Sequence, residues 1–294
     1  MKWQGRRQSS NVNDARGRGF TGGRKVAAGG GFGLIIALVV FLLTGNPGVL
    51  TGGLDNQNII VPSGSQQQAQ YEPSQREQQL FEYAGVVLAD IEDTWNTLLP
   101  KEGKQYVEPE LTIYSGMVQS GCGTADSGVG PFYCPRDHSI YLDLSFYDTL
   151  IERYGAKQGG FSMAYVIAHE AGHHVQTILG VTQQLDELRQ QAAAGRLSQE
   201  EFNQYSVRFE LQADYLAGVV ARYMAEKGYL EEGDLEEALS AAAAVGDDHI
   251  QKKMQGYADP DTFNHGTSAQ RQRWFMEGYK AGDLSGWDTF SNPI

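Results

Sequence analysis

The feature that most constrains the fold is the stretch His169-Glu170-Ala171-Gly172-His173, which lies in an apolar segment of helical character. Residues four apart project from one face of a helix. The imidazoles of His169 and His173 are therefore brought together, as two ligands of a tetrahedral zinc ion require. Glu170 borders the same face, where it can take a proton from a zinc-bound water. The pattern indicates metal-assisted hydrolysis, most often of a peptide bond.

The alternative interpretation is a surface helix that carries two ordinary histidines. The residues just before the motif, Ala164-Tyr165-Val166-Ile167-Ala168, argue against it because they are apolar. A buried histidine pair needs polar partners, and a metal ion is the obvious one. We therefore favour the zinc site.

A third ligand is predicted in a second helical segment, Phe209-Glu210-Leu211-Gln212-Ala213-Asp214. Glu210 and Asp214 are four residues apart on one face, among apolar neighbours. Two buried carboxylates repel each other unless a positive group lies nearby, and a zinc ion with its histidines supplies one. Glu210 is the predicted third ligand, and Asp214 the predicted acceptor of a ligand imidazole's free N–H. The alternative is a solvated acidic face.

A histidine as third ligand is disfavoured. Metzincins place H-x-x-G-x-x-H at and after the second motif histidine, whereas this chain continues His173-His174-Val175-Gln176-Thr177-Ile178-Leu179. His174 lies about 140° around the helix from His169, at 100° per residue. We expect His174 to be a packing residue or a partner of a ligand rather than a ligand.

With these pieces in place, the chain resembles the zincins that use a glutamate as third ligand, the gluzincins. More narrowly, it resembles the bacterial neutral zinc metallopeptidase family with an N-terminal membrane anchor. The matching segments are Lys2-Trp3-x-Gly5-Arg6-Arg7 with Asn11-Val12, residues 169–176, residues 210–214, and His265-Gly266-Thr267-Ser268-x-Gln270-Arg271. The resemblance implies peptidase activity with Zn²⁺ as cofactor, and it leaves the physiological substrate open.

The N-terminal region has a strong charge asymmetry. Residues 1–25 contain seven Lys and Arg but a single acid, Asp14, whereas the whole chain of 294 residues has a formal net charge of −13. We interpret residues 1–25 as a disordered basic tail. A nucleic-acid-binding arm is the rival interpretation, and it is disfavoured because the remainder of the chain is strongly acidic.

An uncharged apolar run follows at residues 26–45, about the length of a membrane span. A cleaved signal peptide is the alternative, but Asn46-Pro47-Gly48 follows without a clear small-residue cleavage site. We expect an uncleaved single-pass helix in the cell membrane, with a cytoplasmic N-terminus and an extracytoplasmic catalytic domain. Residues 46–73 are predicted to be a flexible linker.

The chain has two cysteines, Cys122 and Cys134, in a glycine-rich region. In an exported domain, such a closely spaced pair indicates a disulfide bond. Two unrelated thiols are the alternative. Metal binding by the pair is disfavoured because no second Cys or His pair stands at a suitable spacing.

Residues 74–294 are predicted to form one α+β domain, mostly helical with a small antiparallel sheet. Capping boxes at Ser74 and Ser198 begin two helices, the second of which carries Glu210. Further helices are expected for residues 186–194, for 234–245, and from Thr267 or Ser268 to before Gly282. Strands are expected at residues 111–114 and 139–144. Residues 138–144 are the candidate strand for pairing with an extended substrate.

His265 precedes the last predicted helix and is our candidate for stabilising the oxyanion of a tetrahedral intermediate. A structural role in the loop is the alternative. The function predicted is a membrane-anchored zinc endopeptidase with a peptide or protein substrate, a membrane association through the N-terminal helix and no nucleic-acid partner. The alternative is an inactive zinc-binding scaffold for peptides or envelope partners, disfavoured because such a site needs no base at Glu170. A zinc amidase acting on the cell wall is least favoured, because it usually requires other ligand spacings.

Overall fold

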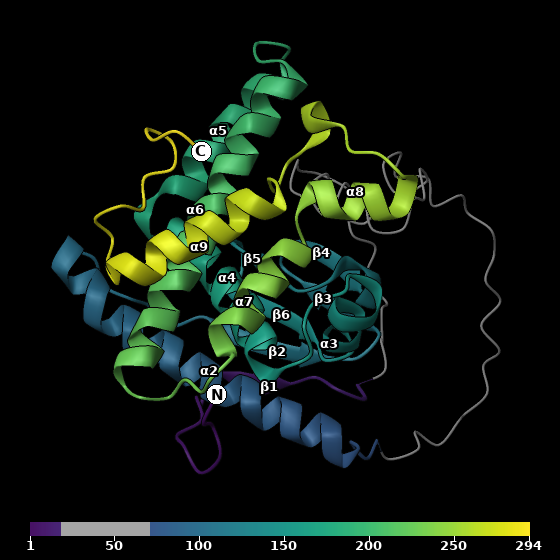
Figure 1. The fold of residues 1–294 in the computed structure, drawn as a ribbon, viewed down its shortest axis with the longest axis vertical. Coiled ribbons are helices and arrows are strands. Elements are labelled where there is room, and N and C mark those ends of the chain that lie inside the picture. Colours follow the sequence, from purple (N-terminus) through teal and green to yellow (C-terminus); the bar gives the residue numbers. More distant parts are fainter. Residues whose placement is uncertain (19–70) are drawn as a thin grey trace.

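Helices make up most of the described chain and stack on a small sheet (Figure 1). The computed structural model describes residues 1–18 and 71–294. The longer helices are α2 (Gln75–Leu98), α4 (Gly160–Leu179), α5 (Val181–Ala193), α6 (Gln199–Glu226), α7 (Asp234–Ala244), α8 (Asp247–Gln255) and α9 (Ser268–Ala281). Short helical turns are η2 (Leu99–Glu102), η3 (Ser127–Val129), α3 (Phe146–Asp148), η4 (Thr149–Arg153) and η5 (Pro260–Thr262). The predicted α+β class is confirmed.

The helix ends follow from local chemistry. Ser74 and Ser198 form the predicted capping boxes at the starts of α2 and α6, and Thr267 forms one at the start of α9. Gly180 ends α4 in the left-handed conformation that glycine adopts without strain. Helix α8 was not predicted, because residues 247–255 are mostly polar and Ile250 and Met254 are their only large apolar side chains.

The sheet is mixed, so the prediction of an antiparallel sheet is wrong. Its strand order is β1 (Val12–Asp14), β2 (Glu110–Tyr114), β6 (Ser139–Asp143) and β5 (Phe132–Cys134). β1 pairs parallel with β2, and β2 with β6, while β5 and β6 are antiparallel. Strands β3 (Met117–Ser120) and β4 (Gly123–Asp126) form a separate antiparallel hairpin. The parallel pairs join strands distant in sequence, which local periodicity does not reveal.

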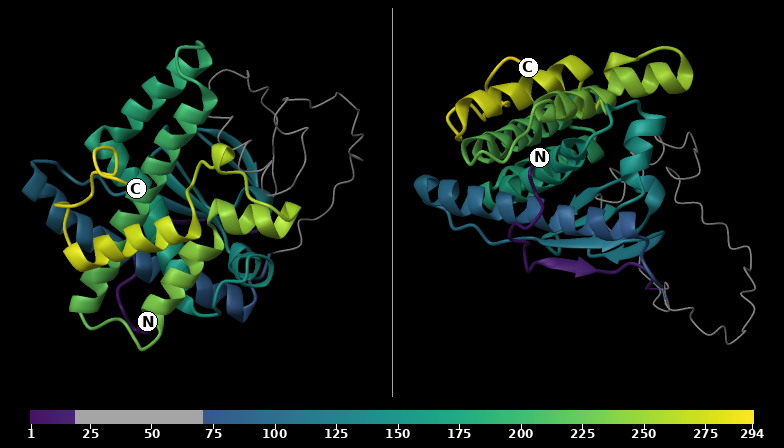
Figure 2. Two further views of the ribbon diagram at one scale, coloured as in Figure 1. Left: turned by 45° about the horizontal axis from the view of Figure 1, so that its top comes forward. Right: turned by 60° about the horizontal axis from the view of Figure 1, so that its bottom comes forward.

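The N-terminal segment, residues 1–18, belongs to the domain. β1 pairs with β2 through Val12↔Leu111 and its two following neighbours (Figure 2). Arg6 forms an ion pair with the buried Asp90 of α2, and Ser9 hydrogen-bonds to the buried Glu92. The prediction of a disordered basic tail is therefore wrong for residues 1–18.

The predicted membrane topology is also corrected. Within residues 1–18 and 71–294, no helix is long and apolar enough to cross a membrane. The apolar run at residues 26–45 lies outside the described residues, as does most of the predicted linker at 46–73. The predicted anchor, cytoplasmic N-terminus and extracytoplasmic domain are not supported.

One large apolar core joins the helices to the sheet. Among its largest fully buried side chains are Trp95 of α2, Ile113 of β2, Phe161 of α4, Tyr215 of α6 and Phe275 of α9. Helices α6 and α9 cross so closely that a Cβ on Gly218 would lie 2.0 Å from the Phe275 carbonyl oxygen. The right-hand view of Figure 2 shows α4, α6 and α9 stacked above the sheet. This stack carries the candidate site.

Candidate metal centre

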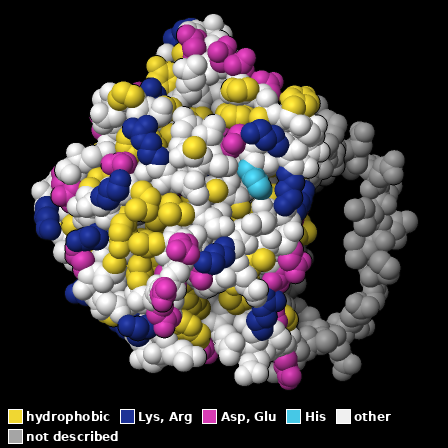
Figure 3. Space-filling model, in the orientation of Figure 1, with side chains coloured by type: hydrophobic (Ala, Val, Ile, Leu, Met, Phe, Trp, Pro, Cys, Tyr) yellow, Lys and Arg dark blue, Asp and Glu magenta, His cyan; other side chains and the backbone are white. Residues whose placement is uncertain are grey.

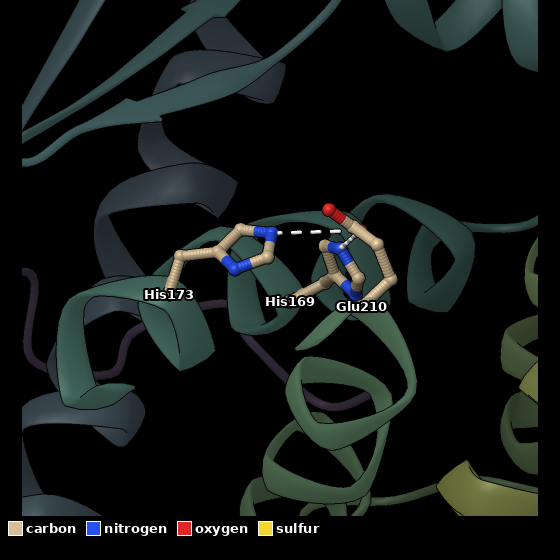
Figure 4. Close-up of side chains that lie close together, drawn as sticks. All are labelled: His169, His173 and Glu210. Atoms are coloured by element: carbon tan, nitrogen blue, oxygen red, sulfur yellow. Dashed lines mark hydrogen bonds and ion pairs between the residues drawn. The ribbon is translucent and has the colours of Figure 1, made fainter. Parts of the chain in front are cut away.

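His169 and His173 of α4 and Glu210 of α6 point toward one another, as predicted (Figure 4). One ligand atom from each residue lies within 4.8 Å of the other two. The Glu210 Oε2 atom is 3.2 Å from His169 Nε2 and 3.6 Å from His173 Nε2. Two imidazoles and a carboxylate are a donor set that zinc accepts, with a fourth position left for water. The residues present therefore fit a zinc ion.

The motif glycine lets the two helices approach. A Cβ on Gly172 would lie 3.0 Å from the Ala213 carbonyl oxygen of α6, closer than nearly all side-chain contacts. Because Gly172 lies between the two histidines in sequence, and Ala213 between Glu210 and Asp214, this contact is the point where α4 and α6 bring their polar residues together. A larger residue at position 172 would push the ligands apart.

The cluster is charged and buried. Burial alone would raise the pKa of Glu210, but His173 and His169 hold the pKa of that carboxyl well below its usual range. Burial alone would lower the pKa of His169, but the carboxylates of Asp214 and Glu210 raise it to about 9. His169 thus carries positive charge beside the buried carboxylates. A bound metal ion would supply that positive charge in its place.

Asp214 holds His169, as predicted. Its Oδ1 atom lies 2.8 Å from His169 Nδ1, which leaves Nε2 toward Glu210. The same oxygen accepts a hydrogen bond of 2.6 Å from the Tyr165 hydroxyl. Arg271 of α9 donates from Nε to Asp214 Oδ2 at 2.8 Å. Burial would raise the pKa of Asp214, yet Arg271 and His169 lower it, so the carboxylate is charged.

Arg271 and Tyr165 had no predicted role. Arg271 is 4 % exposed and Tyr165 is 2 % exposed, so both are internal partners of Asp214. Arg271 lies in a motif that carried the family resemblance, which was the available signal for its importance. Its contact with a residue 57 positions away required the fold.

His173 is held by a second set of contacts that sequence reasoning missed. Its Nδ1 atom lies 2.8 Å from the side-chain oxygen of Gln176. The Gln176 amide nitrogen in turn donates to the Phe209 carbonyl oxygen and to Gln212, both on α6. The Phe209 ring stacks on the His173 ring with an interplanar angle of 11°. Both candidate ligand histidines are therefore oriented by contacts of their Nδ1 atoms, as is usual at zinc sites.

Glu170 lines the same cavity as the two histidines and Glu210. Burial raises its pKa, while His173 and His169 oppose that rise. The nearby backbone of Tyr133 in β5 also opposes the rise in this pKa. Glu170 thus borders one cavity with the histidine pair and β5, where the sequence pattern predicts a base.

His265 reaches the same cavity from the loop before α9. Its Nδ1 atom lies 3.2 Å from Asp247 Oδ1. The other oxygen of Asp247 accepts backbone N–H groups of Asn264, His265 and Gly266 at 2.7–2.9 Å. Burial would lower the pKa of His265, but Asp247 raises it. Asp247 was missed because it belongs to the unpredicted helix α8.

His174 packs beneath the site and is not a ligand, in agreement with the sequence analysis. It is 1 % exposed, its Nε2 lies 2.6 Å from the Val107 carbonyl oxygen, and its Nδ1 lies 2.9 Å from the Tyr133 hydroxyl. Burial lowers the pKa of His174 to about 4, so its ring is neutral at pH 7.

The cleft strand is β5 rather than the predicted residues 138–144. The cavity, about 250 Å³ in volume, is lined by residues 129–133 together with Pro135, and by the metal-centre residues. β6 has a hydrogen-bonded neighbour on each side, β2 and β5, so it has no free edge for a substrate. β5 is at the edge of this sheet in the described chain. A disulfide joins Cys134, at the end of β5, to Cys122 in the β3–β4 turn, as predicted.

A family model described as "putative neutral zinc metallopeptidase" matches residues 1–290. The chain belongs to this family. The match spans the N-terminal segment, the helical body and all residues of the metal centre. It agrees with a donor set suited to zinc, and it supports zinc as the metal and hydrolysis as the reaction class.

Two relatives show how far the similarity extends. The chain is 46 % identical over 298 residues to the uncharacterized protein YpfJ of Escherichia coli K12, with all of both chains covered. It is 44 % identical over 211 residues to the uncharacterized protein Rv2575 of Mycobacterium tuberculosis H37Rv, which covers 68 % of this chain and 67 % of the relative. No solved structure matches the chain.

Proposed function

We propose that this protein is a zinc-dependent endopeptidase. The observation that carries the proposal is the arrangement of His169, His173 and Glu210, whose ligand atoms lie within 4.8 Å of one another beside Glu170 in one cavity. A bound zinc ion would supply Lewis acidity and lower the pKa of a water molecule at its open position. The family match supports this chemistry.

Glu170 is the proposed general base and, later, the general acid. A group that accepts a proton and returns it works best with a pKa near the working pH. Burial moves the pKa of Glu170 upward, in that direction. We propose that Glu170 takes the proton of the attacking water and passes it to the leaving amine.

His265 is the proposed partner of the developing oxyanion. Its Nδ1 faces Asp247, so its Nε2 is the nitrogen free to donate into the cavity. The raised pKa of His265 favours the protonated ring, which is the better donor to a negative oxygen. Asp247 would then hold the imidazole in position.

The substrate proposed is an extended peptide or protein segment that adds to the free edge of β5. Edge strands present unpaired backbone groups to which such a segment can hydrogen-bond. On the face shown in Figure 3, Lys and Arg side chains are interspersed with Asp and Glu, without one continuous basic surface. This mixed face supports a peptide partner over a nucleic acid.

The test combines metal analysis with hydrolysis of a denatured protein substrate. We expect one zinc per chain, activity that is lost with a chelator and restored with zinc, and loss of zinc in His169→Ala and Glu210→Ala proteins. Full zinc content in both variants would refute the ligand assignment. One bound zinc without any Glu170-dependent hydrolysis would instead favour an inactive peptide-binding scaffold.

A further inference from the structure

Tyr133 is the central residue of β5, and its side chain faces the opposite way from those of its neighbours. Phe132 and Cys134 pack into a small cluster with Val118 and Tyr141 on one face of the sheet. Tyr133 packs against the main core on the other face, where α4 lies. The side chain of Tyr133 therefore points toward the helix that carries His169 and His173.

β5 lies beside the proposed base. Glu170 and residues 129–133 line the same cavity. Within the described chain, β5 has β6 as its neighbour on one side and is the edge of this sheet on the other. An edge strand offers unpaired backbone groups to an extended peptide. The position of β5 relative to α4 therefore sets where such a peptide would lie relative to Glu170.

The side chain of Tyr133 is tied to α4. His174 Nε2 lies 2.6 Å from the Val107 carbonyl oxygen, so this nitrogen carries the proton and donates. In the neutral ring, Nδ1 then accepts the hydrogen bond of 2.9 Å from the Tyr133 hydroxyl. Because His174 directly follows His173, this hydrogen bond connects β5 to the turn of α4 that bears a metal ligand.

His138 completes the enclosure of the hydroxyl. Its Nδ1 lies 3.2 Å from the Tyr133 hydroxyl oxygen, whose proton is already directed at His174, so His138 is the donor here. His138 has a φ of 55°, and in the described part of the chain it is the one non-glycine residue with positive φ. Such a backbone conformation persists when surrounding contacts over-determine it. The Tyr133 hydroxyl is thus held between two imidazoles from different elements.

We propose that Tyr133 and His174 are a pair of positioning residues that fix the register of the substrate strand relative to Glu170 and the metal centre. This inference rests on the proposed peptidase function and deepens it. β5 is short and at an edge, so pairing with β6 alone leaves its position along α4 weakly specified. The Tyr133–His174 hydrogen bond removes that freedom. The backbone edge of β5 then meets a bound peptide at one fixed distance from the base.

The test compares Tyr133→Phe with Tyr141→Phe in the full-length, zinc-loaded chain. Each change removes one tyrosine hydroxyl from neighbouring strands. The Tyr141 hydroxyl donates to Asp137 Oδ2 at 2.8 Å, and Tyr141 does not line the cavity. We expect kcat/KM to fall on the order of 10- to 100-fold in Tyr133→Phe, as when partners that orient a site are lost. In Tyr141→Phe, kcat/KM should stay within about threefold of the wild type. The melting temperature of Tyr141→Phe should fall by about as much as that of Tyr133→Phe.

Hydrogen exchange gives a readout that is independent of activity. In Tyr133→Phe, the amides of residues 132–134 should exchange faster, whereas Tyr141→Phe should leave them close to the wild type. The double variant with Tyr133→Phe and His174→Gln should have the same kcat/KM as the less active of the two single variants. Both substitutions remove the same hydrogen bond, so their effects should not add. Zinc content should be unchanged in Tyr133→Phe.

The outcomes separate this inference from the proposed function. If the wild type hydrolyses peptide with full dependence on Glu170, but Tyr133→Phe and Tyr141→Phe have equal kcat/KM, the positioning role is refuted and the peptidase stands. Unchanged amide exchange in β5 of Tyr133→Phe would also refute it, whatever the activity. If the zinc-loaded wild type itself hydrolyses nothing, the proposed function fails, and faster exchange in Tyr133→Phe alone would still show the structural link.

Discussion

The metal centre and the N-terminal segment both depend on charged groups paired below the surface, but they are assembled in different ways. His169 and His173 are four residues apart on α4, and Glu210 and Asp214 are four apart on α6. In the N-terminal segment, Arg6 pairs with Asp90, which is 84 residues away. Each half of the metal centre is set by the geometry of one helix, whereas the N-terminal contacts exist only in the folded domain.

This difference suggests a division of roles. The proposed function gives the metal-centre residues a chemical role, and a metal ion would relieve the repulsion between their buried carboxylates. The N-terminal residues do not line the cavity, and they pair with buried carboxylates of α2. Substitutions in the first region should change activity more than stability, and those in the second the reverse.

The largest expected effect is on catalysis by Glu170→Gln. The amide keeps the size of the side chain but cannot accept a proton, so kcat should fall by about 10²- to 10⁴-fold. Zinc content and melting temperature should match the wild type, because Glu170 is not among the ligands. Glu200→Gln, at an exposed position in the first turn of α6, is the matched control and should retain full activity. Near-normal turnover by zinc-loaded Glu170→Gln would exclude this residue as the base.

On the N-terminal side, Arg6→Ala should lower the free energy of unfolding by about 3 to 5 kcal/mol at neutral pH, since it leaves Asp90 buried without its partner. Asp90 is 2 % exposed. Arg7 provides the control, because its side chain is 53 % exposed and its buried partner Glu92 keeps hydrogen bonds from Ser9 and Asn11. Arg7→Ala should therefore cost about 1 kcal/mol or less. Chemical denaturation measures both, and activity per folded molecule should stay unchanged. Equal small effects in the two variants would show that the segment contributes little to the domain.

The cost of Arg6→Ala should depend on pH. Burial raises the folded-state pKa of Asp90 from 3.8 to about 6, while Arg6 opposes that rise. A carboxyl whose pKa is higher in the folded state opposes folding when ionised, and this penalty disappears as pH falls toward the unfolded value. Without Arg6, the folded pKa rises further. The loss in free energy of unfolding caused by Arg6→Ala should therefore be larger at pH 8 than at pH 5. An equal loss at both pH values would contradict the pairing of Arg6 with an ionised Asp90.

The contrast between contacts within one helix and contacts between distant residues also explains which site residues could be predicted from the sequence. His169, His173, Glu210 and Asp214 were found because helix geometry turns a spacing of four into one face, and apolar neighbours show that the face is buried. The structure brings them together as predicted. Arg271, Gln176 and Asp247 were not assigned roles, because a lone polar residue has no periodicity and its partner is known only from the fold.

The sheet and the N-terminal segment show more clearly what sequence patterns do not predict. Residues 1–25 have the composition of a disordered tail, yet Val12–Asp14 forms a strand because β2 offers a free edge. Composition describes what a segment can bury by itself, and it does not register acceptors elsewhere in the chain. Likewise, the choice of β5 over residues 138–144 as cleft strand depended on strand order, which alternation within one strand does not specify.

The disulfide tests an intermediate case, in which the partners are only 12 residues apart but one is in the β3–β4 turn and the other at the end of β5. Replacing Cys122 and Cys134 together by serine should lower the free energy of unfolding by about 3 kcal/mol, because the bond restricts the conformations open to the unfolded chain. A denaturant titration of this variant, compared with wild type under oxidising and reducing conditions, measures the effect. Reduced wild type should match the double variant, and if oxidised wild type matches it as well, the bond does not stabilise the domain.

The smallest expected effect concerns Asp247, a residue of α8 that holds the ring of His265 in the loop before α9. Asp247→Asn keeps an oxygen for the backbone N–H groups of Asn264, His265 and Gly266 but removes the negative charge that holds the His265 ring. Loss of such a partner typically reduces activity on the order of 10- to 100-fold, and here it should act on kcat because His265 is proposed to contact the developing oxyanion. Asp248→Asn is the control, since Asp248 binds the backbone N–H and hydroxyl of Ser268 and does not contact His265. Zinc content should be unchanged in both. The pKa of His265 is raised by Asp247, so the imidazole of Asp247→Asn should lose its proton at a lower pH, and the alkaline limb of the kcat profile should move down with it. An unchanged kcat and pH profile in Asp247→Asn would remove His265 from the reaction and leave the metal centre and Glu170 as the whole of the catalytic apparatus.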